Sequence, residues 1–219
     1  MKLLLMQSES LKSTWTDKVN TTEIFTVNIE DISRNEYDTA YFLMSEKRRR
    51  KCDALRFLDD KKRCIAADML LRRVLAEKTG LSENALVFGV YDNGKPYLVG
   101  EKYFFSISHS GKYVCVAVNR EKPVGVDIEE IKSVNSRIAK RVFSESDMCY
   151  VFENSEYPDC IISDPSVLER FFRVWTYKEA YVKMTGEGID DNIRNISYVP
   201  ENCHCELSDG YCISVVTKE

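Results

Sequence analysis

The sequence lacks any apolar run that approaches the ~20 residues needed to cross a bilayer, so its 219 residues predict no membrane-spanning helix. The apolar start, Met1 to Met6, is shorter than the ~7–15 residue core of a signal peptide, and no small-residue cleavage site follows it. We therefore expect a cytoplasmic protein in which residues 1–6 form a first strand.

An excess of positive charge is also missing. The 31 Lys and Arg residues are outnumbered by 35 Asp and Glu residues, which argues against nucleic-acid binding because that requires an extended basic face. The charge is unevenly spread, since residues 1–120 carry a net charge of +4 and residues 121–219 a net charge of −8. The first half is thus suited to attract anions, and the second half to hold a cation.

Zinc-ligand spacing is absent among the eight cysteines. Without an export signal, reduced thiols are expected rather than a disulfide framework. The segment Cys203-His204-Cys205 with Cys212 resembles a ligand set only superficially, because Cys203 and Cys205 alternate as on one face of a strand. We therefore predict neither a metal site nor disulfides at these thiols.

What is present is an ordinary globular composition, with 44% apolar and 30% charged residues, and a length that fits one large domain or two small ones. Helical spacing and end signals predict helices over residues 34–58, 60–79, 136–152 and 166–184. Alternating patterns predict strands over residues 24–29, 104–108, 113–118, 124–128, 195–199, 203–207 and 211–217.

A faint internal repeat accompanies the uneven charge. Ser110-Gly111-Lys112-Tyr113 opens a strand in the first half, and Ser208-Asp209-Gly210-Tyr211 opens one in the second. Together, the repeat and the charge predict an α+β fold of two similar halves, 1–120 and 121–219. Each half would carry helices on a small antiparallel sheet.

Two pairs of side chains have the spacing of a catalytic site. Asp127 and Glu129 are two residues apart on a predicted strand and leave the same face, where they repel unless a cation such as Mg²⁺ lies between them. Glu179 and Lys183 are four residues apart on a predicted helix with little other polar surface, so we expect them in a cleft. Taken singly, these pairs also fit two exposed carboxylates at a strand end and a solvated Glu–Lys pair.

Three basic features are candidates for binding an anion. His109 lies among serines at a strand end, where hydroxyl and backbone N–H groups bind anions, although a structurally bonded loop histidine fits the pattern too. Lys95 lies in the turn Gly94-Lys95-Pro96. The basic run Lys47 to Lys51 ends a predicted helix, where a solvated helix end is the simpler interpretation.

Taken in order, these elements resemble the 4′-phosphopantetheinyl transferases of the broad-specificity, surfactin-synthetase-activating type. The resemblance covers residues 44–190 and is specific only in combination. Its motifs are Lys47 to Lys51 with Arg56-Phe57, Arg63 with Asp68, Gly94-Lys95-Pro96, Phe105-Ser106-Ile107-Ser108-His109-Ser110, Gly125-Val126-Asp127-Ile128-Glu129, and Trp175 to Lys183 with Gly186-x-Gly188.

The resemblance implies a pseudo-dimer with its active site in the cleft between the halves. It implies that the 4′-phosphopantetheine arm of coenzyme A is moved to a serine of an acyl or peptidyl carrier protein, with Mg²⁺ required and adenosine 3′,5′-bisphosphate released. Such an enzyme is a holo-[carrier protein] synthase. We expect a monomer, because one chain supplies both halves of the cleft. The carrier is open: fatty-acid, polyketide and nonribosomal peptide synthesis all use one.

The same resemblance implies roles for individual residues. Mg²⁺ would be bound by Asp127, Glu129 and Glu179. Coenzyme A would be held by Lys47, Arg50 or Lys51, Arg63, Lys95, Ser108, His109 and Lys183. Catalysis would rest on Glu179, Lys183 and His109, with either Glu179 or a metal-bound water accepting the serine proton. An acidic carrier would dock on Ile138, Lys140, Arg141 and Phe143, unless that segment is only a structural amphipathic helix.

Two other functions fit some of the same residues. A Mg²⁺-dependent phosphohydrolase would use the three carboxylates to release phosphopantetheine to water, and it would consume coenzyme A without a carrier. A non-catalytic coenzyme A-binding protein is disfavoured, because a binding protein has no need for three converging carboxylates.

Overall fold

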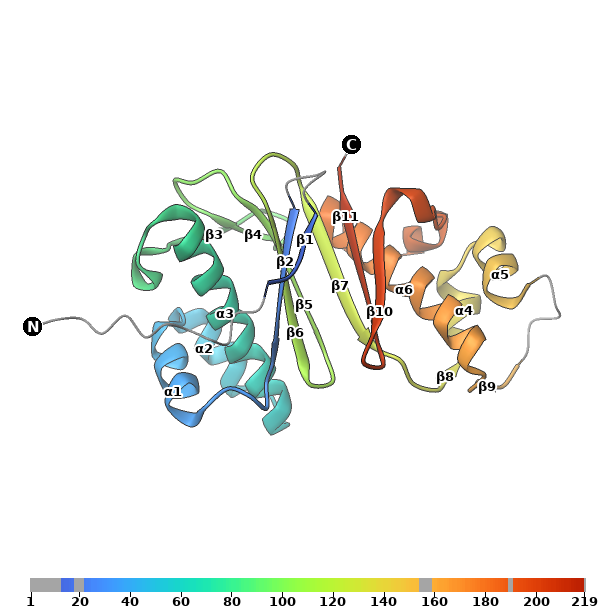
Figure 1. Ribbon diagram of the computed structural model, residues 1–219, viewed down its shortest axis with the longest axis horizontal. Helices are drawn as coiled ribbons and strands as arrows, with labels where there is room; N and C mark the ends of the chain where they lie inside the picture. Colours follow the sequence, from blue (N-terminus) through green and yellow to red (C-terminus); the bar gives the residue numbers. More distant parts are fainter. Residues whose placement is uncertain (1–12, 18–21, 154–158, 189–190, 219) are drawn as a thin grey trace, which may run out of the picture.

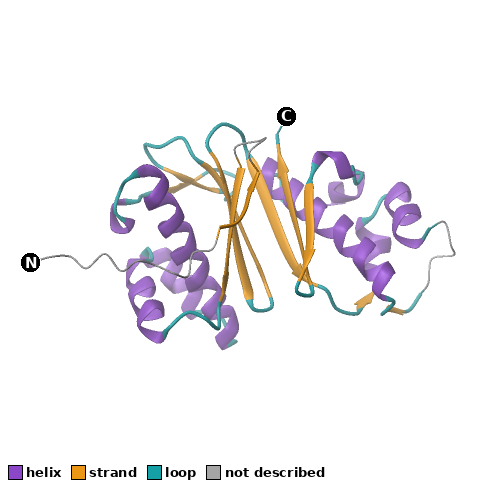
Figure 2. Ribbon diagram, viewed as in Figure 1, coloured by secondary structure: helices purple, strands orange, loops and turns teal. Residues whose placement is uncertain are grey.

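The computed structural model describes residues 13–17, 22–153, 159–188 and 191–218, so the strand predicted at residues 1–6 lies outside the described residues. Helices cover the two outer sides of the molecule, and the main sheets lie between them (Figures 1 and 2). Within the described ranges, every helix is too short or too polar to span a bilayer.

The first half contains a four-stranded antiparallel sheet with strand order β1-β2-β6-β5, and a separate β3-β4 hairpin. Helix α3 covers this sheet and ends at Gly80, whose φ of 75° favours glycine. The elements are β1 (Ser13–Asp17), β2 (Thr22–Asn28), α1 (Arg34–Leu43), α2 (Glu46–Asp53), α3 (Leu58–Thr79), η1 (Glu83–Ala85), β3 (Phe88–Val90), β4 (Pro96–Leu98), β5 (Phe104–Ser110) and β6 (Tyr113–Asn119).

The second half contains a three-stranded sheet with strand order β10-β11-β7, and a short β8-β9 pair. Helix α6 begins after Asp164, whose carboxylate accepts the backbone N–H groups of Ser166 and Val167. The elements are β7 (Val124–Glu130), β8 (Val134–Asn135), α4 (Arg137–Val142), α5 (Glu145–Phe152), β9 (Ile161–Ile162), α6 (Pro165–Thr185), η2 (Asp191–Asn195), η3 (Pro200–Asn202), β10 (His204–Ser208) and β11 (Tyr211–Thr217).

The two halves share one plan, since the order β2-α3-β5-β6 in the first is repeated as β7-α6-β10-β11 in the second. The repeated turn sequences close the β5–β6 and β10–β11 hairpins, and these turns touch each other. The rings of Tyr113 and Tyr211 lie 4.9 Å apart, and the Tyr113 hydroxyl donates to Asp209 at 2.9 Å. The predicted α+β pseudo-dimer is confirmed.

A buried apolar layer joins the two sheets. Strand β6 is apolar on both faces, which is typical of a strand covered on both sides. Val114 and Val116 belong to the core beneath α3, whereas Cys115 and Ala117 pack with Val126 of β7. The halves are therefore connected by a shared core as well as by the chain.

Three predicted elements differ in the structure. The helix expected over 34–58 is broken because Ser45 caps a new helix and accepts the backbone N–H of Arg48 at 3.3 Å. The helix expected over 136–152 is broken by a capping box between Ser144 and Asp147. The strand expected over 195–199 is absent: the 3₁₀ helix η2 ends at Asn195 and a loop follows.

Strand β7 and helix α6 approach each other closely at Gly125. A Cβ atom at this position would lie 1.8 Å from the carbonyl oxygen of Ala180 and 2.6 Å from the backbone nitrogen of Met184. Only glycine allows this contact between backbones. It brings Asp127 of the strand within hydrogen-bond distance of Lys183 of the helix.

Candidate active site

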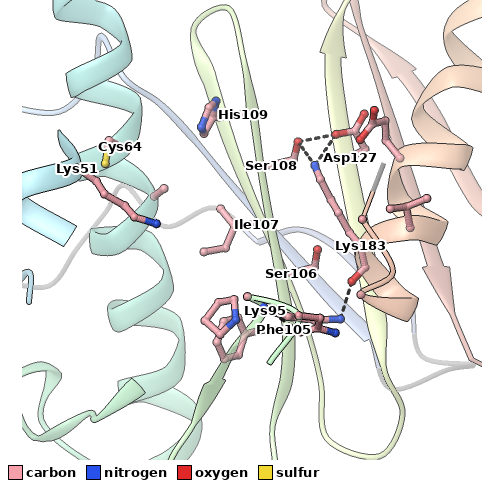
Figure 3. A pocket seen from close by; sticks show the side chains of 18 of the residues that line it. Lys51, Cys64, Lys95, Phe105, Ser106, Ile107, Ser108, His109, Asp127 and Lys183 are labelled. Carbon is pink, nitrogen blue, oxygen red and sulfur yellow. Dashed lines mark hydrogen bonds and ion pairs between the residues drawn. The ribbon is translucent and has the colours of Figure 1, made fainter. Parts of the chain in front are cut away.

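A cavity of about 880 Å³ lies between the halves and is lined by residues of α2, α3, β5, β7 and α6 and of the β3–β4 hairpin (Figure 3). It collects polar side chains from positions far apart in the sequence. Eight of the site residues predicted from the sequence line it: Lys51, Lys95, Ser108, His109, Asp127, Glu129, Glu179 and Lys183.

Asp127 is the most deeply buried of these carboxylates, with 3% exposure. Its Oδ1 atom accepts hydrogen bonds from Lys183 Nζ and from the Ser108 hydroxyl, both at 2.7 Å (Figure 3). Lys183 also donates to Ser108 at 2.8 Å, so the three groups close a triangle. Burial raises the pKa of Asp127, and the contacts from Lys183 and Ser108 oppose that rise.

Glu179 and Glu129 bring two further carboxyl groups to the cavity. Glu179 lies one turn before Lys183 on α6 and is 8% exposed. Burial raises the pKa of Glu179 to about 7, and the negative charges of Asp127 and Glu129 add to the effect. Glu129 accepts a hydrogen bond from Ser110 at 2.7 Å. Asp127 and Glu129 are thus close enough to Glu179 to oppose its ionisation.

Alternate serines of β5 connect the two halves along the cavity. Ser106, Ser108 and Ser110 leave one face of the strand, because side chains alternate along it. Ser106 accepts the backbone N–H of Val126, and Ser110 that of Glu130, each at 3.1 Å. The sequence suggests these serines for anion binding. They also join β5 to β7, and their spacing of two residues along the strand is the sequence feature that indicates this shared face.

The donor set fits a divalent cation. Among the described residues, no three metal-binding side chains already surround one point, and Lys183 is bound to Oδ1 of Asp127. However, Oδ2 of Asp127 is buried without a hydrogen-bond partner. A buried carboxylate oxygen normally has a partner, and Mg²⁺ prefers such oxygen ligands. Asp127 therefore has an oxygen that a cation could bind, and Glu129 and Glu179 are further carboxylates of the same lining.

The basic run of α2 is held against α3 by a buried carboxylate. Asp68 of α3 is 3% exposed and pairs with Arg48 at 2.8 Å and with Arg72 at 2.7 Å. Lys51 and Arg48 both line the cavity. Sequence analysis did not identify this anchoring role, because it depends on the contact between two helices.

The other basic residues expected at the site lie beside the cavity. Arg50 pairs with Glu46 on the exposed face of α2, so Lys51 is the one of the two alternatives that lines the cavity. Lys47 is also exposed and outside the lining. Arg63 donates to the carbonyl oxygen of Gly111 at 2.6 Å and pairs with Asp60, a lining residue.

Lys95 lines the cavity, but its ammonium group is bound to backbone. Nζ donates to the carbonyl oxygens of Lys183 at 2.6 Å and Met184 at 3.0 Å, in the last turn of α6 (Figure 3). A cation is favourable at a helix C-terminus. Burial lowers the pKa of Lys95. Lys95 therefore caps α6 from the other half of the molecule, in addition to any contact with a ligand.

His109 lies on β5 itself, because the strand continues to Ser110 and the turn is formed by Gly111 and Lys112. Desolvation by the surrounding protein lowers the pKa of His109, although its side chain remains exposed, and the positive charges of Arg63 and Lys183 act in the same direction. These influences favour the neutral imidazole, which has one hydrogen-bond donor and one acceptor.

Lys178 and Phe143 are core residues. The Lys178 ammonium is fully buried, pairs with Asp147 at 2.7 Å and donates to the carbonyl oxygen of Val142 at 2.9 Å. The Phe143 ring, also fully buried, lies 5.0 Å from that of Phe171. The prediction that Phe143 docks a carrier is wrong, because no part of its side chain reaches the surface.

Comparison with known proteins identifies the family. The N-terminal 4′-phosphopantetheinyl transferase model matches residues 31–121, and the 4′-phosphopantetheinyl transferase superfamily model matches residues 123–207. A 4′-phosphopantetheinyl transferase of Bacillus subtilis is 33% identical over 184 residues, which cover 82% of this chain and 78% of the relative. The transferase Sfp of Bacillus subtilis strain 168 is 30% identical over 160 residues, covering 72% of this chain and 67% of the relative. The chain therefore belongs to the 4′-phosphopantetheinyl transferase superfamily and is an enzyme of the Sfp type.

Proposed function

We propose that this enzyme transfers the 4′-phosphopantetheine group of coenzyme A to a serine of an acyl or peptidyl carrier protein, depends on Mg²⁺, and releases adenosine 3′,5′-bisphosphate. The observation that carries the proposal is the meeting of Asp127, Glu129, Glu179 and Lys183 in one cavity lined by both halves. Its volume of about 880 Å³ lies within the roughly 300–1,000 Å³ range of ligand pockets.

The charges around the cavity suit the phosphates of coenzyme A. Lys51 would bind the 3′-phosphate together with Arg63, which pairs with the lining residue Asp60, and Lys183 would bind the pyrophosphate. Ser108 and His109 offer hydrogen bonds between these cations. Lys47 and Arg50 lie on the same helix as Lys51 but outside the lining, so they would attract the phosphates through their charge rather than by contact.

The carboxylates would serve two purposes. Asp127, Glu129 and Glu179 would hold Mg²⁺, which neutralises the charge that develops on a departing phosphate ester. Glu179 would accept the proton of the carrier serine, either directly or by way of a water molecule. The serine oxygen forms a bond to the phosphorus that carries pantetheine, and the bond from that phosphorus to the oxygen of adenosine bisphosphate breaks.

The carrier would approach along α4. Ile138, Lys140 and Arg141 are exposed there, with Ile138 at 39%. One apolar and two cationic side chains suit an acidic partner that also buries an apolar side chain. Both halves of the cavity belong to one chain, which is consistent with action as a monomer.

The test measures the mass of an apo carrier protein after incubation with the enzyme, coenzyme A and Mg²⁺. An acyl carrier and a peptidyl carrier are used, each with a variant whose acceptor serine is replaced by alanine. We expect a gain of one phosphopantetheine group on the unmodified carriers, and no gain on the alanine variants or in EDTA. No gain on either carrier type would contradict the proposal.

The same assay separates transfer from hydrolysis. Without carrier, the release of adenosine bisphosphate from coenzyme A reports attack by water. We expect release to be much slower than in the presence of carrier, and equal rates would indicate a phosphohydrolase instead.

A further inference from the structure

A pair of thiols lies outside the cavity, between α6 and the β10–β11 hairpin. Cys205 stands opposite Ser214 in the strand register, and Cys212 stands opposite Leu207, so the two cysteines are diagonal neighbours on one face of the hairpin. Their Sγ atoms are 3.6 Å apart, and both thiols are free. Neither residue has a role in the proposed transfer.

The surroundings make the two thiols unequal. Contact with the Cys212 thiol lowers the pKa of Cys205 to about 6, and Ser214 and the charge of Arg173 act in the same direction. Cys205 is only partly buried, and a thiol of this kind is mostly thiolate at pH 7. Cys212 is fully buried, and its Sγ lies 3.3 Å from the Thr176 hydroxyl. Cys205 therefore has the character of an attacking thiol, and Cys212 that of a resolving thiol.

We propose that Cys205 and Cys212 are a modification site at which exchange with a low-molecular-weight disulfide closes a reversible intramolecular disulfide. Cys205 Sγ forms a bond to one sulfur of the small disulfide and displaces the other as a thiolate. That thiolate takes the proton of Cys212, whose sulfur then attacks Cys205 Sγ and releases the second small thiol. Two protein thiols are oxidised and one small disulfide is reduced to two thiols, so atoms and electrons balance.

Closure of the disulfide requires the two strands to shift so that the sulfur atoms come into bonding distance. The two sulfur atoms must approach from 3.6 Å to about 2.05 Å, the length of a disulfide bond. Among the described strands, β10 pairs with β11 alone, and such an edge strand is freer to shift than a central one. Cys212 contacts Thr176, which lies on α6 one turn before Glu179.

A second thiol pair in the first half provides an internal control. Cys52 and Cys64 also interact, but burial raises the pKa of Cys52 to about 11, with Cys64 and Asp53 adding to the effect. A thiol with a raised pKa reacts slowly, because the thiolate is the attacking form. We expect Cys52 and Cys64 to stay reduced at an oxidant concentration that closes Cys205 and Cys212.

The experiment incubates the folded full-length protein with oxidised glutathione, blocks the remaining thiols with iodoacetamide and measures intact mass. We expect the loss of two hydrogen atoms, reversed by dithiothreitol. Cleavage at Glu206 or Asp209 separates the two cysteines and identifies the linked peptides. The link should vanish in Cys205→Ser and Cys212→Ser, and persist in Cys203→Ser and Cys160→Ser.

Two further variants keep the proposal testable if Cys212→Ser does not fold. Arg173→Gln should close about threefold more slowly or worse at pH 7, because a smaller fraction of Cys205 is then thiolate, whereas Arg173→Lys should close nearly normally. The proposal is overturned if Cys205 accumulates as a mixed disulfide with Cys212 still free, or if Cys52 and Cys64 oxidise first.

Discussion

Helices α3 and α6 hold equivalent places in the two halves, yet their buried charges differ in how completely they are paired. Helix α3 buries Asp68, which two arginine side chains neutralise. Helix α6 buries Lys178, which Asp147 neutralises, and directly after it Glu179, whose pKa is raised to about 7. A buried charge with matched partners fixes the packing of its helix, whereas a carboxyl group buried near other carboxyl groups is available for chemistry.

The largest expected effect is on the rate of transfer, and it comes from replacing Glu179, the buried carboxyl group that lies near other carboxyl groups. Glu179→Gln keeps the size of the side chain but removes its ability to accept a proton, so we expect transfer to fall by about 10²–10⁴-fold. Coenzyme A binding should remain close to that of the parent enzyme. Carrier modification followed by mass spectrometry measures the rate, and an unchanged rate would remove Glu179 from the mechanism.

Replacing the neighbouring Lys178, which is paired with Asp147, should lower the stability of the fold. Lys178→Met leaves Asp147 buried without its cation, which typically costs about 3–5 kcal/mol of the free energy of unfolding. Urea denaturation measures the loss, and the double variant Lys178→Met/Asp147→Asn should recover part of it. A loss below about 1 kcal/mol would show that the ion pair does not hold α6 in place.

The free energy of unfolding should depend on pH through Glu179. In metal-free protein the pKa of Glu179 is raised from 4.5 to about 7, so the folded state binds the proton more tightly than the unfolded state. The resulting stabilisation is complete below about pH 4.5 and is lost as the pH rises through 7, with an upper limit of about 3 kcal/mol. Thermal unfolding in EDTA from pH 5 to 8 measures it. Glu179→Gln should lack this part of the pH dependence, and identical curves for both proteins would contradict the assignment.

The smallest effects concern coenzyme A binding. Lys183→Ala and Arg63→Ala should each weaken binding by about 1–3 kcal/mol, the range for a hydrogen bond to a charged group. Arg50→Ala is the matched control, because this arginine pairs with Glu46 on the exposed face of α2. Titration calorimetry measures all three. Equal weakening by Arg50→Ala and Arg63→Ala would show that the phosphate assignment is misplaced.

Long elements with strong local signals could be predicted from the sequence. The helix ending at Gly80 and the two hairpins with related turns follow from periodicity and turn residues. The helix breaks at Ser45 and Ser144 were not predicted, because each serine lies inside an otherwise continuous helical pattern. The structure shows that both serines have an extended backbone and cap a new helix.

The candidate site shows the same limit. The spacing of Asp127, Glu129, Glu179 and Lys183, with the family resemblance, was enough to select side chains that share one cavity. The bond from Lys95 to the carbonyl oxygen of Lys183 spans 88 positions and leaves no local pattern. The burial of Phe143 was likewise hidden, because an aromatic residue after an exposed helix fits both a docking surface and a core.

The contact at Gly125 has a consequence for how tolerant the site is to change. A methyl group there would clash with backbone atoms of α6, and rotation of a side chain could not relieve that clash. Strand and helix would have to separate, carrying the aspartate away from the ammonium group that it holds. The contact between Asp127 and Lys183 therefore depends on the absence of a side chain at Gly125, a residue that takes no part in the chemistry.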